Sequence, residues 1–360
     1  MKNITRRSFI GVGASAAMVA ALAGCSSGSG SASSASAESA SAESASAESA
    51  SAESASAEAS AAASAGAGLR FVTGGEAGTY YALGTIMAQH VKDAGLDVTA
   101  VSSDGSKSNV LDLEDGVAQL AFCQSDVAAY AFNGSTFEDF EGMPIEIFST
   151  VADLYEEQVQ IVTCNPEIKS VSDLKGKNVS IGAAGSGVYF NAIDVLSVYD
   201  ITEADITPTY QSFADSTEAL KDGKIDAAFI VAGAPTSAIT DLATTKEAYL
   251  VAIDAEHAEQ LKAKSEFYNV ATISAGTYKG NDEDITTVSV DSLVLAADSV
   301  SEDDVYTFVS DIFENIDALS EAHDKFKEFS LEKAASYSVV PYHPGAAKYF
   351  GEKGQTVATK

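Results

Sequence analysis

Short apolar runs alternate with longer segments whose apolar residues recur every three or four positions through most of residues 69–330. The runs predict buried β-strands, and the periodic segments predict helices with one apolar face. The predicted strands are 70–73, 98–101, 120–122, 179–181 and 227–231. The predicted helices are 80–92, 108–115, 126–132, 188–199, 216–222 and 235–243. This alternation predicts an α/β protein with parallel sheets covered on both faces.

Two apolar segments depart from this alternation and suggest how the domains are organised. Residues 146–163 have the pattern of two strands around Leu154, and residues 286–297 first alternate and then become continuously apolar. We interpret residues 158–163 as the segment that leaves a first α/β unit, and 286–297 as the segment that returns to it. The predicted domains are therefore 69–162 with 286–360, and 163–285, joined by two linking strands that can hinge around a cleft. Residues 302–336 are predicted to be mostly helical.

Glycine-rich loops lie between predicted strands and helices and are the first candidates for a binding site. The sharpest covers residues 73–81, a second covers 182–187, and a weaker one, 104–106, precedes the helix at 108. Glycine lets the backbone approach a ligand, and the free N–H groups at a helix start carry partial positive charge. Because two of the loops fall in different predicted domains, we expect them to face each other across the cleft. Such loops also occur for purely steric reasons.

Other kinds of site fit the sequence less well. The glycine spacings do not give the G-x-G-x-x-G of a dinucleotide site, and no Walker A sequence is present. Ser186 lies in Gly-Ser-Gly, which resembles part of a nucleophile turn but lacks the full G-x-S-x-G. The four histidines have no metal-ligand spacing, and no C-x-x-C occurs. We therefore expect a protein that is not an enzyme, with no cofactor and no metal.

The charge of the chain limits its partners. It has 52 acidic and 21 basic residues, and three of the bases lie in residues 1–24, which leaves a formal charge of −34 on the remainder. Such a protein repels nucleic acid and anionic lipid, so no nucleic-acid partner is expected. No arginine follows Arg70, and an acidic ligand would therefore be held by helix N-termini, hydroxyl groups or a lysine.

The first 68 residues read as a leader and a spacer. Residues 1–24 combine three bases with an Ala-rich apolar stretch, which is typical of a signal peptide, and Arg6-Arg7 resembles a twin-arginine signal. Leu22-Ala23-Gly24-Cys25 resembles a lipobox, which predicts lipidation of Cys25 and attachment to the outer face of the cell membrane through that lipid only. Residues 25–68 repeat Ser, Ala and Glu and contain nothing bulky to bury, so we expect a flexible acidic linker.

Two further cysteines, Cys123 and Cys164, lie in apolar segments. A disulfide between them is compatible with an oxidising compartment, and the apolar setting favours two buried free thiols.

An ordered set of motifs over about residues 69–330 resembles the TAXI family, the solute-binding subunits of one class of tripartite ATP-independent periplasmic (TRAP) transporters. The motifs are Thr73-Gly74-Gly75 with Gly78-Thr79-Tyr80-Tyr81, Gln124-Ser125-Asp126, Leu174-Lys175-Gly176-Lys177, Gly185-Ser186-Gly187, Asp226-Ala227-Ala228-Phe229 with Gly233 and Pro235, and Gly276-Thr277-Tyr278. The resemblance implies a two-domain fold like that of type II periplasmic binding proteins, with a hinge and an interdomain cleft. It also implies capture of a small carboxylate-bearing ligand, such as glutamate, glutamine or a 2-oxoglutarate-like acid, and its delivery to membrane permease subunits.

The family motifs, together with the third loop, give the candidate ligand-binding residues. They are Gly78, Thr79, Tyr80, Tyr81, Ser106, Gln124, Asp126, Gly185, Ser186, Gly187 and Pro235. Two alternatives stay open at this point: Tyr80 can belong to the core, and Asp126 can cap the helix that it opens. Two other functions also stay open, a binding protein that reports to a membrane receptor and a secreted hydrolase that uses Ser186.

Overall fold

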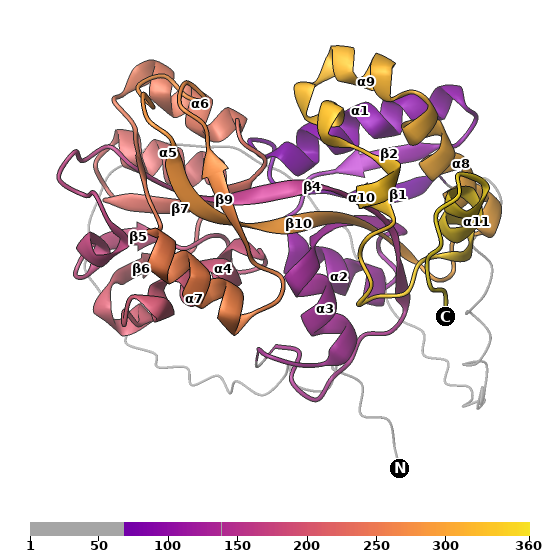
Figure 1. The fold of residues 1–360 in the computed structure, drawn as a ribbon, viewed down its shortest axis with the longest axis horizontal. Coiled ribbons are helices and arrows are strands. Elements are labelled where there is room, and N and C mark those ends of the chain that lie inside the picture. Colours follow the sequence, from indigo (N-terminus) through magenta and orange to yellow (C-terminus); the bar gives the residue numbers. More distant parts are fainter. Residues whose placement is uncertain (1–67, 138) are drawn as a thin grey trace, which may run out of the picture. The chain divides into compact units, whose positions relative to one another are not determined.

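The strands form one mixed β-sheet in the computed structural model, which describes residues 68–137 and 139–360 (Figure 1). The predicted signal peptide, Cys25 and almost all of the linker lie outside the described residues. The strand order is β2-β1-β3-β10-β4-β7-β5-β6, with β8 paired to β4 and β9 paired to β10. The strands are β1 Leu69–Val72, β2 Val98–Val101, β3 Leu120–Gln124, β4 Phe148–Thr163, β5 Asn178–Ser180, β6 Thr207–Thr209, β7 Ala227–Ala232, β8 Tyr249–Val251, β9 Asn269–Ile273 and β10 Ile285–Ala297.

Helices cover both faces of this sheet (Figure 1). The α-helices are α1 Thr79–Asp93, α2 Ser106–Glu114, α3 Ser125–Asn133, α4 Val188–Val198, α5 Phe213–Lys221, α6 Ser237–Thr245, α7 Ala255–Lys264, α8 Glu302–Glu314, α9 Ile316–Ala322, α10 Leu331–Ala334 and α11 Pro344–Glu352. Short 3₁₀ turns are η2 Val171–Leu174, η3 Glu203–Asp205 and η4 Asp324–Glu328. The α/β class predicted from the sequence is confirmed.

The prediction of wholly parallel sheets is wrong. β1 pairs in parallel with β2 and β3, and β5 pairs in parallel with β6 and β7. The two long strands are different, because β10 runs antiparallel to both β3 and β4, and β4 runs antiparallel to β7. A periodicity analysis detects burial on both faces of a strand but carries no information about strand direction.

The prediction of two strands in residues 146–163 is also wrong, since β4 is one strand of 16 residues. Leu154, where a break was expected, is buried within it. Pairing with β10 shifts register between Ser292 and Leu293 and again between Val294 and Leu295, so local irregularities accommodate the change in pattern without ending the strand. β4 and β10 therefore run side by side through the middle of the sheet (Figure 1).

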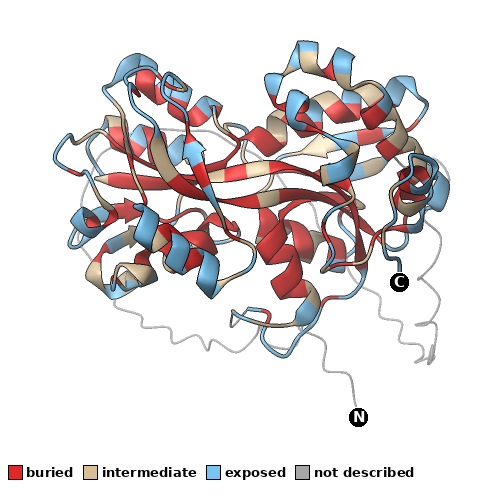
Figure 2. Cartoon of the chain, in the orientation of Figure 1, coloured by how far each residue is buried: buried red, intermediate tan, exposed pale blue. Residues whose placement is uncertain are grey.

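The core contains three clusters of buried apolar side chains. Buried residues follow the central strands and the helix faces that meet them (Figure 2). The first cluster surrounds Phe71, whose ring stacks on Phe122 with centroids 5.0 Å apart and meets the edge of Phe308 at 5.7 Å. Nearly all of its members come from residues 71–155 and 293–350, whereas the other two clusters draw on residues 159–290. The proposed domain boundaries at 162/163 and 285/286 stay a prediction.

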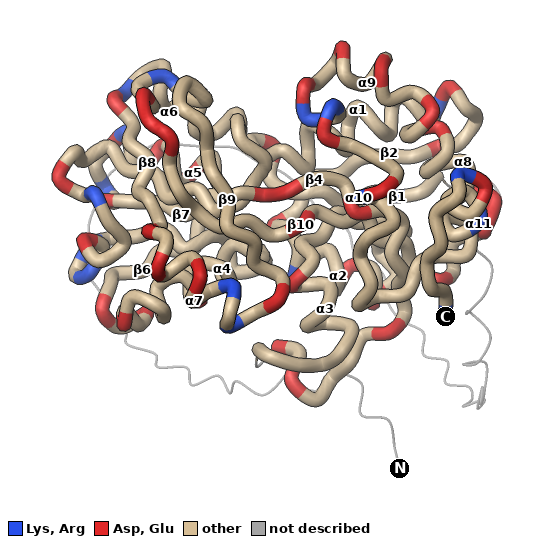
Figure 3. Tube along the Cα trace, in the orientation of Figure 1, with Lys and Arg blue, Asp and Glu red and all other residues tan. Residues whose placement is uncertain are grey.

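Local sequence explains where the helices begin and what they bury. Helix α8 begins after Ser301, whose hydroxyl accepts a hydrogen bond from the N–H of Asp304 at 3.1 Å, and three acidic residues occupy its first turn. Its buried face repeats at helical spacing through Val305, Phe308 and Ile312. Acidic and basic positions lie mainly on helices and loops, with acidic segments also on β4 and β10 (Figure 3). Within the described residues, none of the helices combines the length and apolarity needed to span a bilayer.

Candidate functional site

Four helices follow strands β1, β2, β5 and β6, each after a short loop at the carboxyl end of the strand. The N-cap residues of these helices, α1, α2, α4 and α5, are Gly78, Gly105, Gly187 and Ser212. All four N-caps line one cavity of about 580 Å³, a volume that includes space open to solvent. The three glycines offer no side chain to the N–H groups of the first turn. Uncapped N-termini carry partial positive charge, so the cavity combines several anion-binding features.

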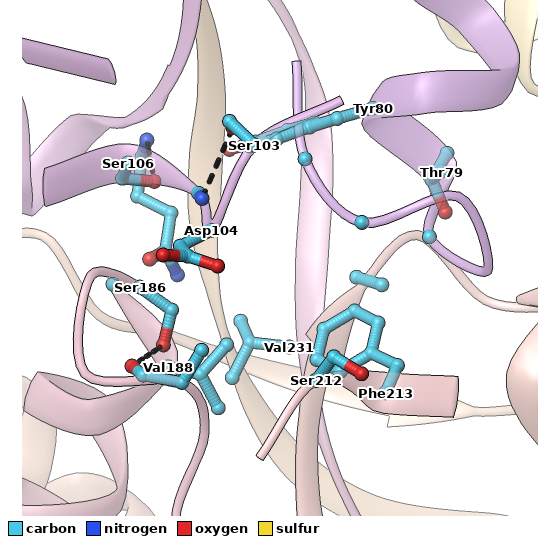
Figure 4. Close-up of a pocket in the computed structure, with 18 of the residues that line it drawn as sticks. Thr79, Tyr80, Ser103, Asp104, Ser106, Ser186, Val188, Ser212, Phe213 and Val231 are labelled. Atoms are coloured by element: carbon cyan, nitrogen blue, oxygen red, sulfur yellow. Dashed lines mark hydrogen bonds between the residues drawn. The ribbon is translucent and has the colours of Figure 1, made fainter. Parts of the chain in front are cut away.

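The walls of the cavity come from both ends of the sheet. Figure 4 shows Tyr80, Ser103 and Ser106 on one side, and Ser186 and Phe213 on the other. The first group follows β1 and β2, and the second follows β5 and β6. The three glycine-containing loops singled out in the sequence therefore meet around one space.

Two glycines allow the loop of residues 181–187 to approach β3 and α2 closely. A Cβ atom at Gly187 would stand 1.5 Å from Oε1 of Gln124, and a Cβ atom at Gly185 would stand 2.0 Å from Oγ of Ser108. The backbone N–H of Ser108 also donates to the carbonyl of Gly185 at 2.9 Å. Larger residues at these positions would push the loop away from the opposite wall.

Seven of the eleven candidate residues line the cavity. These are Gly78, Thr79, Tyr80, Ser106, Gln124, Ser186 and Gly187. Ligand contact by any of them stays a prediction. Their hydroxyl groups are partly engaged already, because Thr79 Oγ1 donates to the carbonyl of Gly233 at 3.1 Å and Ser186 Oγ donates to the carbonyl of Ala183 at 2.7 Å.

The other four candidates do not line the cavity. Tyr81 is half-buried on α1, and Pro235 is exposed after a cis peptide bond. Gly185 packs against α2 instead. Asp126 is completely buried in α3, where its carboxylate accepts from the N–H of Val127 at 2.8 Å. Asp126 does not cap α3, because the N-cap residue is Gln124 and the helix has no side-chain cap; Asp126 lies in its first turn.

A buried polar network joins the cavity wall to α4. Gln124 Nε2 donates to Oδ1 of Asn191 at 2.7 Å, and Nδ2 of Asn191 lies within hydrogen-bond distance of Asp126 Oδ2 at 2.9 Å and of the Tyr268 hydroxyl at 3.0 Å. The Tyr268 hydroxyl donates onward to Asp194 at 3.0 Å. Burial raises the pKa of Asp126 to about 7. The network therefore connects the motif at β3 to the helix that follows the second glycine loop.

Tyr80 has two roles in the structure. Its ring stacks on Phe122 with centroids 4.6 Å apart, so the ring belongs to the core. Tyr80 also lines the cavity, and its buried hydroxyl has no hydrogen-bond partner within the described part of the chain. The ring of Tyr80 therefore packs in the core, as one interpretation of the sequence held, and the residue also lines the cavity, as the other held.

Glu157 is the main cavity residue that sequence reasoning missed. It lies on β4 with 2 % of its surface exposed, and the Tyr155 hydroxyl donates to its Oε1 at 3.4 Å. Burial raises the pKa of Glu157 to about 8. An acidic residue inside a segment predicted to be a buried strand is itself a signal, because an unpaired charge is rarely placed there.

The electrostatic character of the cavity follows from its carboxyl groups. Its lining includes buried Glu157 and exposed Asp104, and among the described lining residues none is lysine, arginine or histidine. Lys325 lies nearby with 4 % exposure, but its ammonium group donates to the carbonyl of Ala234 at 3.0 Å and to Glu328 at 2.6 Å.

The described part of the chain also contains side-chain types that ligate metals, and two cysteines. Within residues 68–137 and 139–360, no group of three or more His, Cys, Asp or Glu side chains has the arrangement needed to hold a metal ion. Cys123 is a buried free thiol in β3, and Cys164 is a half-buried free thiol after β4. Burial raises the pKa of both thiols.

The fold and the cavity define an α/β protein on one mixed sheet, with a cavity at the point where four helices begin. The chain belongs to the NMT1-like family, whose model matches residues 71–354.

Several solved structures are similar to this chain at low identity. They include the alkanesulfonate-binding protein SsuA from Xanthomonas axonopodis pv. citri bound to MOPS, at 16% identity over 79% of this chain and 90% of that chain, with a TM-score of 0.45. The periplasmic aliphatic sulphonate-binding protein SsuA from Escherichia coli matches at 16% identity over 79% and 90%, with a TM-score of 0.41. An ancestral arginine-binding protein bound to arginine matches at 14% identity over 72% and 97%, with a TM-score of 0.44.

Proposed function

We propose that this chain is an extracytoplasmic solute-binding lipoprotein and not an enzyme. It captures a small carboxylate-bearing ligand in the cavity and delivers it to the membrane subunits of a TRAP-type transporter of the TAXI class. The observation that carries this proposal is the convergence of four helix N-caps on one cavity, three of them glycines without a side-chain cap. Such N-termini stabilise a carboxylate without a guanidinium group, which fits a chain that has no arginine after Arg70.

The hydrolase alternative has little support from the geometry. A serine nucleophile needs a neighbouring base, and the described cavity lining contains no histidine. The Ser186 hydroxyl donates to the carbonyl of Ala183 within its own loop, which orients the group as part of the loop.

Attachment to the membrane supports delivery. The lipobox at Cys25 and the Ser/Ala/Glu linker would hold the binding domain near a permease and raise its local concentration there. The transporter class rests on the order of motifs along the chain.

The proposal is tested with a thermal-shift screen of the mature protein against amino acids, dicarboxylic acids, 2-oxo acids and sulfonates. We expect at least one carboxylate ligand to raise the melting temperature, with affinity then measured by isothermal titration calorimetry. The ligand class fails if no carboxylate stabilises the protein while another solute does.

A second arm of the same experiment tests the position of the site by filling it. Gly75 lines the cavity, and a Cβ atom there would meet nothing within 4 Å. Gly75→Leu should therefore weaken ligand binding by at least about tenfold, while the protein keeps its melting temperature. Gly351→Leu is the matched control, since position 351 on α11 is equally open and lies outside the cavity. Wild-type affinity in both variants would place the ligand elsewhere.

A further inference from the structure

The cavity contains a buried acidic side chain, Glu157, that forms no ion pair with any cation of the described residues. Glu157 is 2 % exposed, and the Tyr155 hydroxyl donates to it at 3.4 Å, which is long for a charge-assisted bond. The Tyr80 hydroxyl also neighbours this carboxyl group, outside hydrogen-bond geometry. Burying a carboxylate is unfavourable unless a cation or several donors compensate for it.

The titratable groups that act on Glu157 lie on five elements, whereas Val290, which pairs with it on β10, and Ala232, at the end of the neighbouring strand β7, are apolar. These groups are Tyr80 on α1, Cys123 on β3, Asp126 on α3, Tyr155 on β4 and Lys325 on η4. Four of these are neutral or acidic, and the one cation, Lys325, is already paired with Glu328 and a carbonyl group. No side chain in the described lining therefore provides a counter-charge inside the cavity.

A second buried polar group points to a ligand at the same place. Tyr80 is 8 % exposed and lines the cavity, and its hydroxyl has no hydrogen-bond partner in the described chain. It is close enough to Glu157 for the two groups to influence each other's pKa. Buried polar atoms without partners are rare in native proteins, and a bound ligand is one common explanation.

The cavity thus presents two opposite features to one small molecule. The N-caps Gly78, Gly105 and Gly187 favour an anionic group, and Glu157 on β4 favours a cationic hydrogen-bond donor. We propose that Glu157 is a specificity-determining residue that selects a protonated amine, so the ligand is a zwitterion of the amino-acid type and not a plain organic acid. This inference rests on the proposed function, because it assumes that the cavity is the solute site.

The proposal has a definite proton balance. With a pKa of about 8, Glu157 carries a proton in most unliganded molecules at pH 7. An ammonium group that binds beside it favours the carboxylate, so the carboxyl O–H bond breaks, the proton passes to solvent, and an ion pair remains. Binding should therefore release up to about one proton per ligand at pH 7, and affinity should increase as the pH approaches 8.

The test compares amino acids with the 2-oxo acids of the same carbon skeleton, beginning with L-glutamate and 2-oxoglutarate. Titration calorimetry is carried out on the mature protein in two buffers of different ionisation enthalpy. In wild type we expect the amino acid of a pair to bind at least about tenfold more tightly than its 2-oxo acid, with net proton release. Glu157→Gln should reduce that preference to within about threefold and abolish the proton release. Glu332→Gln, at an exposed carboxylate on α10 outside the cavity, is the matched control and should keep both.

The outcomes separate this inference from the proposed function. If 2-oxo acids bind wild type as tightly as amino acids, or if Glu157→Gln keeps the preference, Glu157 is not the selector although the solute site stands. If neither series binds, the proposed function fails together with this inference. Proton release is measured on wild type, so the proposal stays falsifiable even if Glu157→Gln does not fold.

Discussion

The contact between Gly187 and Gln124 gives the sharpest prediction about stability. In Gly187→Ala, the new Cβ atom would stand 1.5 Å from Gln124 Oε1, 2.6 Å from its Cδ and 3.0 Å from Cγ2 of Val127. The Gln124 side chain cannot simply rotate away, because its Nε2 donates to Asn191 at 2.7 Å in a buried setting. The variant must therefore break that hydrogen bond, move the 181–187 loop, or do both.

The magnitude follows from these two costs. Overpacking a buried site costs about 1–3 kcal/mol, and leaving a buried polar group unpaired costs a similar amount. Because the loop can relax in part, we expect a loss of about 2–4 kcal/mol in the free energy of unfolding. This corresponds to a fall of about 4–12 °C in melting temperature.

The assay is urea denaturation followed by circular dichroism, with calorimetry as a second measurement. Gly351→Ala is the control, because a Cβ atom there meets nothing within 4 Å and alanine favours helix. In a Gln124→Ala background the two shortest contacts vanish, so Gly187→Ala should then cost at least about 1 kcal/mol less than in wild type. A Gly187→Ala protein within about 0.5 kcal/mol of wild type, or equal costs in both backgrounds, would refute the packing account.

Three further predictions concern titration, the Tyr80 hydroxyl and the thiols. Burial raises the pKa of Asp126 to about 7 and that of Glu157 to about 8. Above a pH of about 4, the folded state therefore binds more protons than the unfolded state. The free energy of unfolding should then fall as the pH rises from about 4 to 8. Urea titrations of Asp126→Asn and Glu157→Gln should each show a weaker pH dependence, and an unchanged slope in both would contradict these shifts. Tyr80→Phe removes a buried hydroxyl that has no hydrogen-bond partner in the described chain. The variant should keep or raise the melting temperature and should weaken ligand binding by about 3–10-fold. Unchanged affinity would show that Tyr80 contributes only to the core. Cys164 is half-buried and Cys123 is fully buried, so a thiol reagent should modify native Cys164 first, and faster labelling of Cys123 would contradict the packing of β3.

The helices and short strands could be predicted from the sequence because their periodicity is a local property. The pattern that predicts the 80–92 helix corresponds to α1, and residues 302–336 contain α8, α9, η4 and α10. Strand direction could not be predicted in the same way, since β4 and β10 pair through residues that are distant in sequence, such as Gln158 and Ser289. Helix α7, residues 255–264, is not among the predicted helices, because its polar sequence has little apolar periodicity.

The candidate site shows a similar division. Glycine loops next to helix starts could be identified locally, and the structure brings them to one cavity. Pro235 and Asp126 were carried over by motif, and their positions outside the cavity depend on how β7 and α3 pack. To predict that Glu157 lines the cavity, one must know which face of β4 meets the cavity. That face depends on the pairing of β4 with β7 and β10. Acids within an apolar strand direct attention to β4, but Asp153 is equally buried there and lies outside the cavity, so the pattern alone does not single out Glu157.

The central claim is that a carboxylate ligand binds at the helix N-termini that surround the cavity. Hydrogen–deuterium exchange of the mature protein, with and without the most stabilising acid of the thermal-shift screen, tests it most directly. We predict that the ligand slows exchange chiefly at the starts of α1, α2 and α4, residues 79–81, 106–107 and 188–190, because the free amides of these first turns donate to the carboxylate. Protection confined to other segments, with these amides unchanged at saturating ligand, would contradict the account.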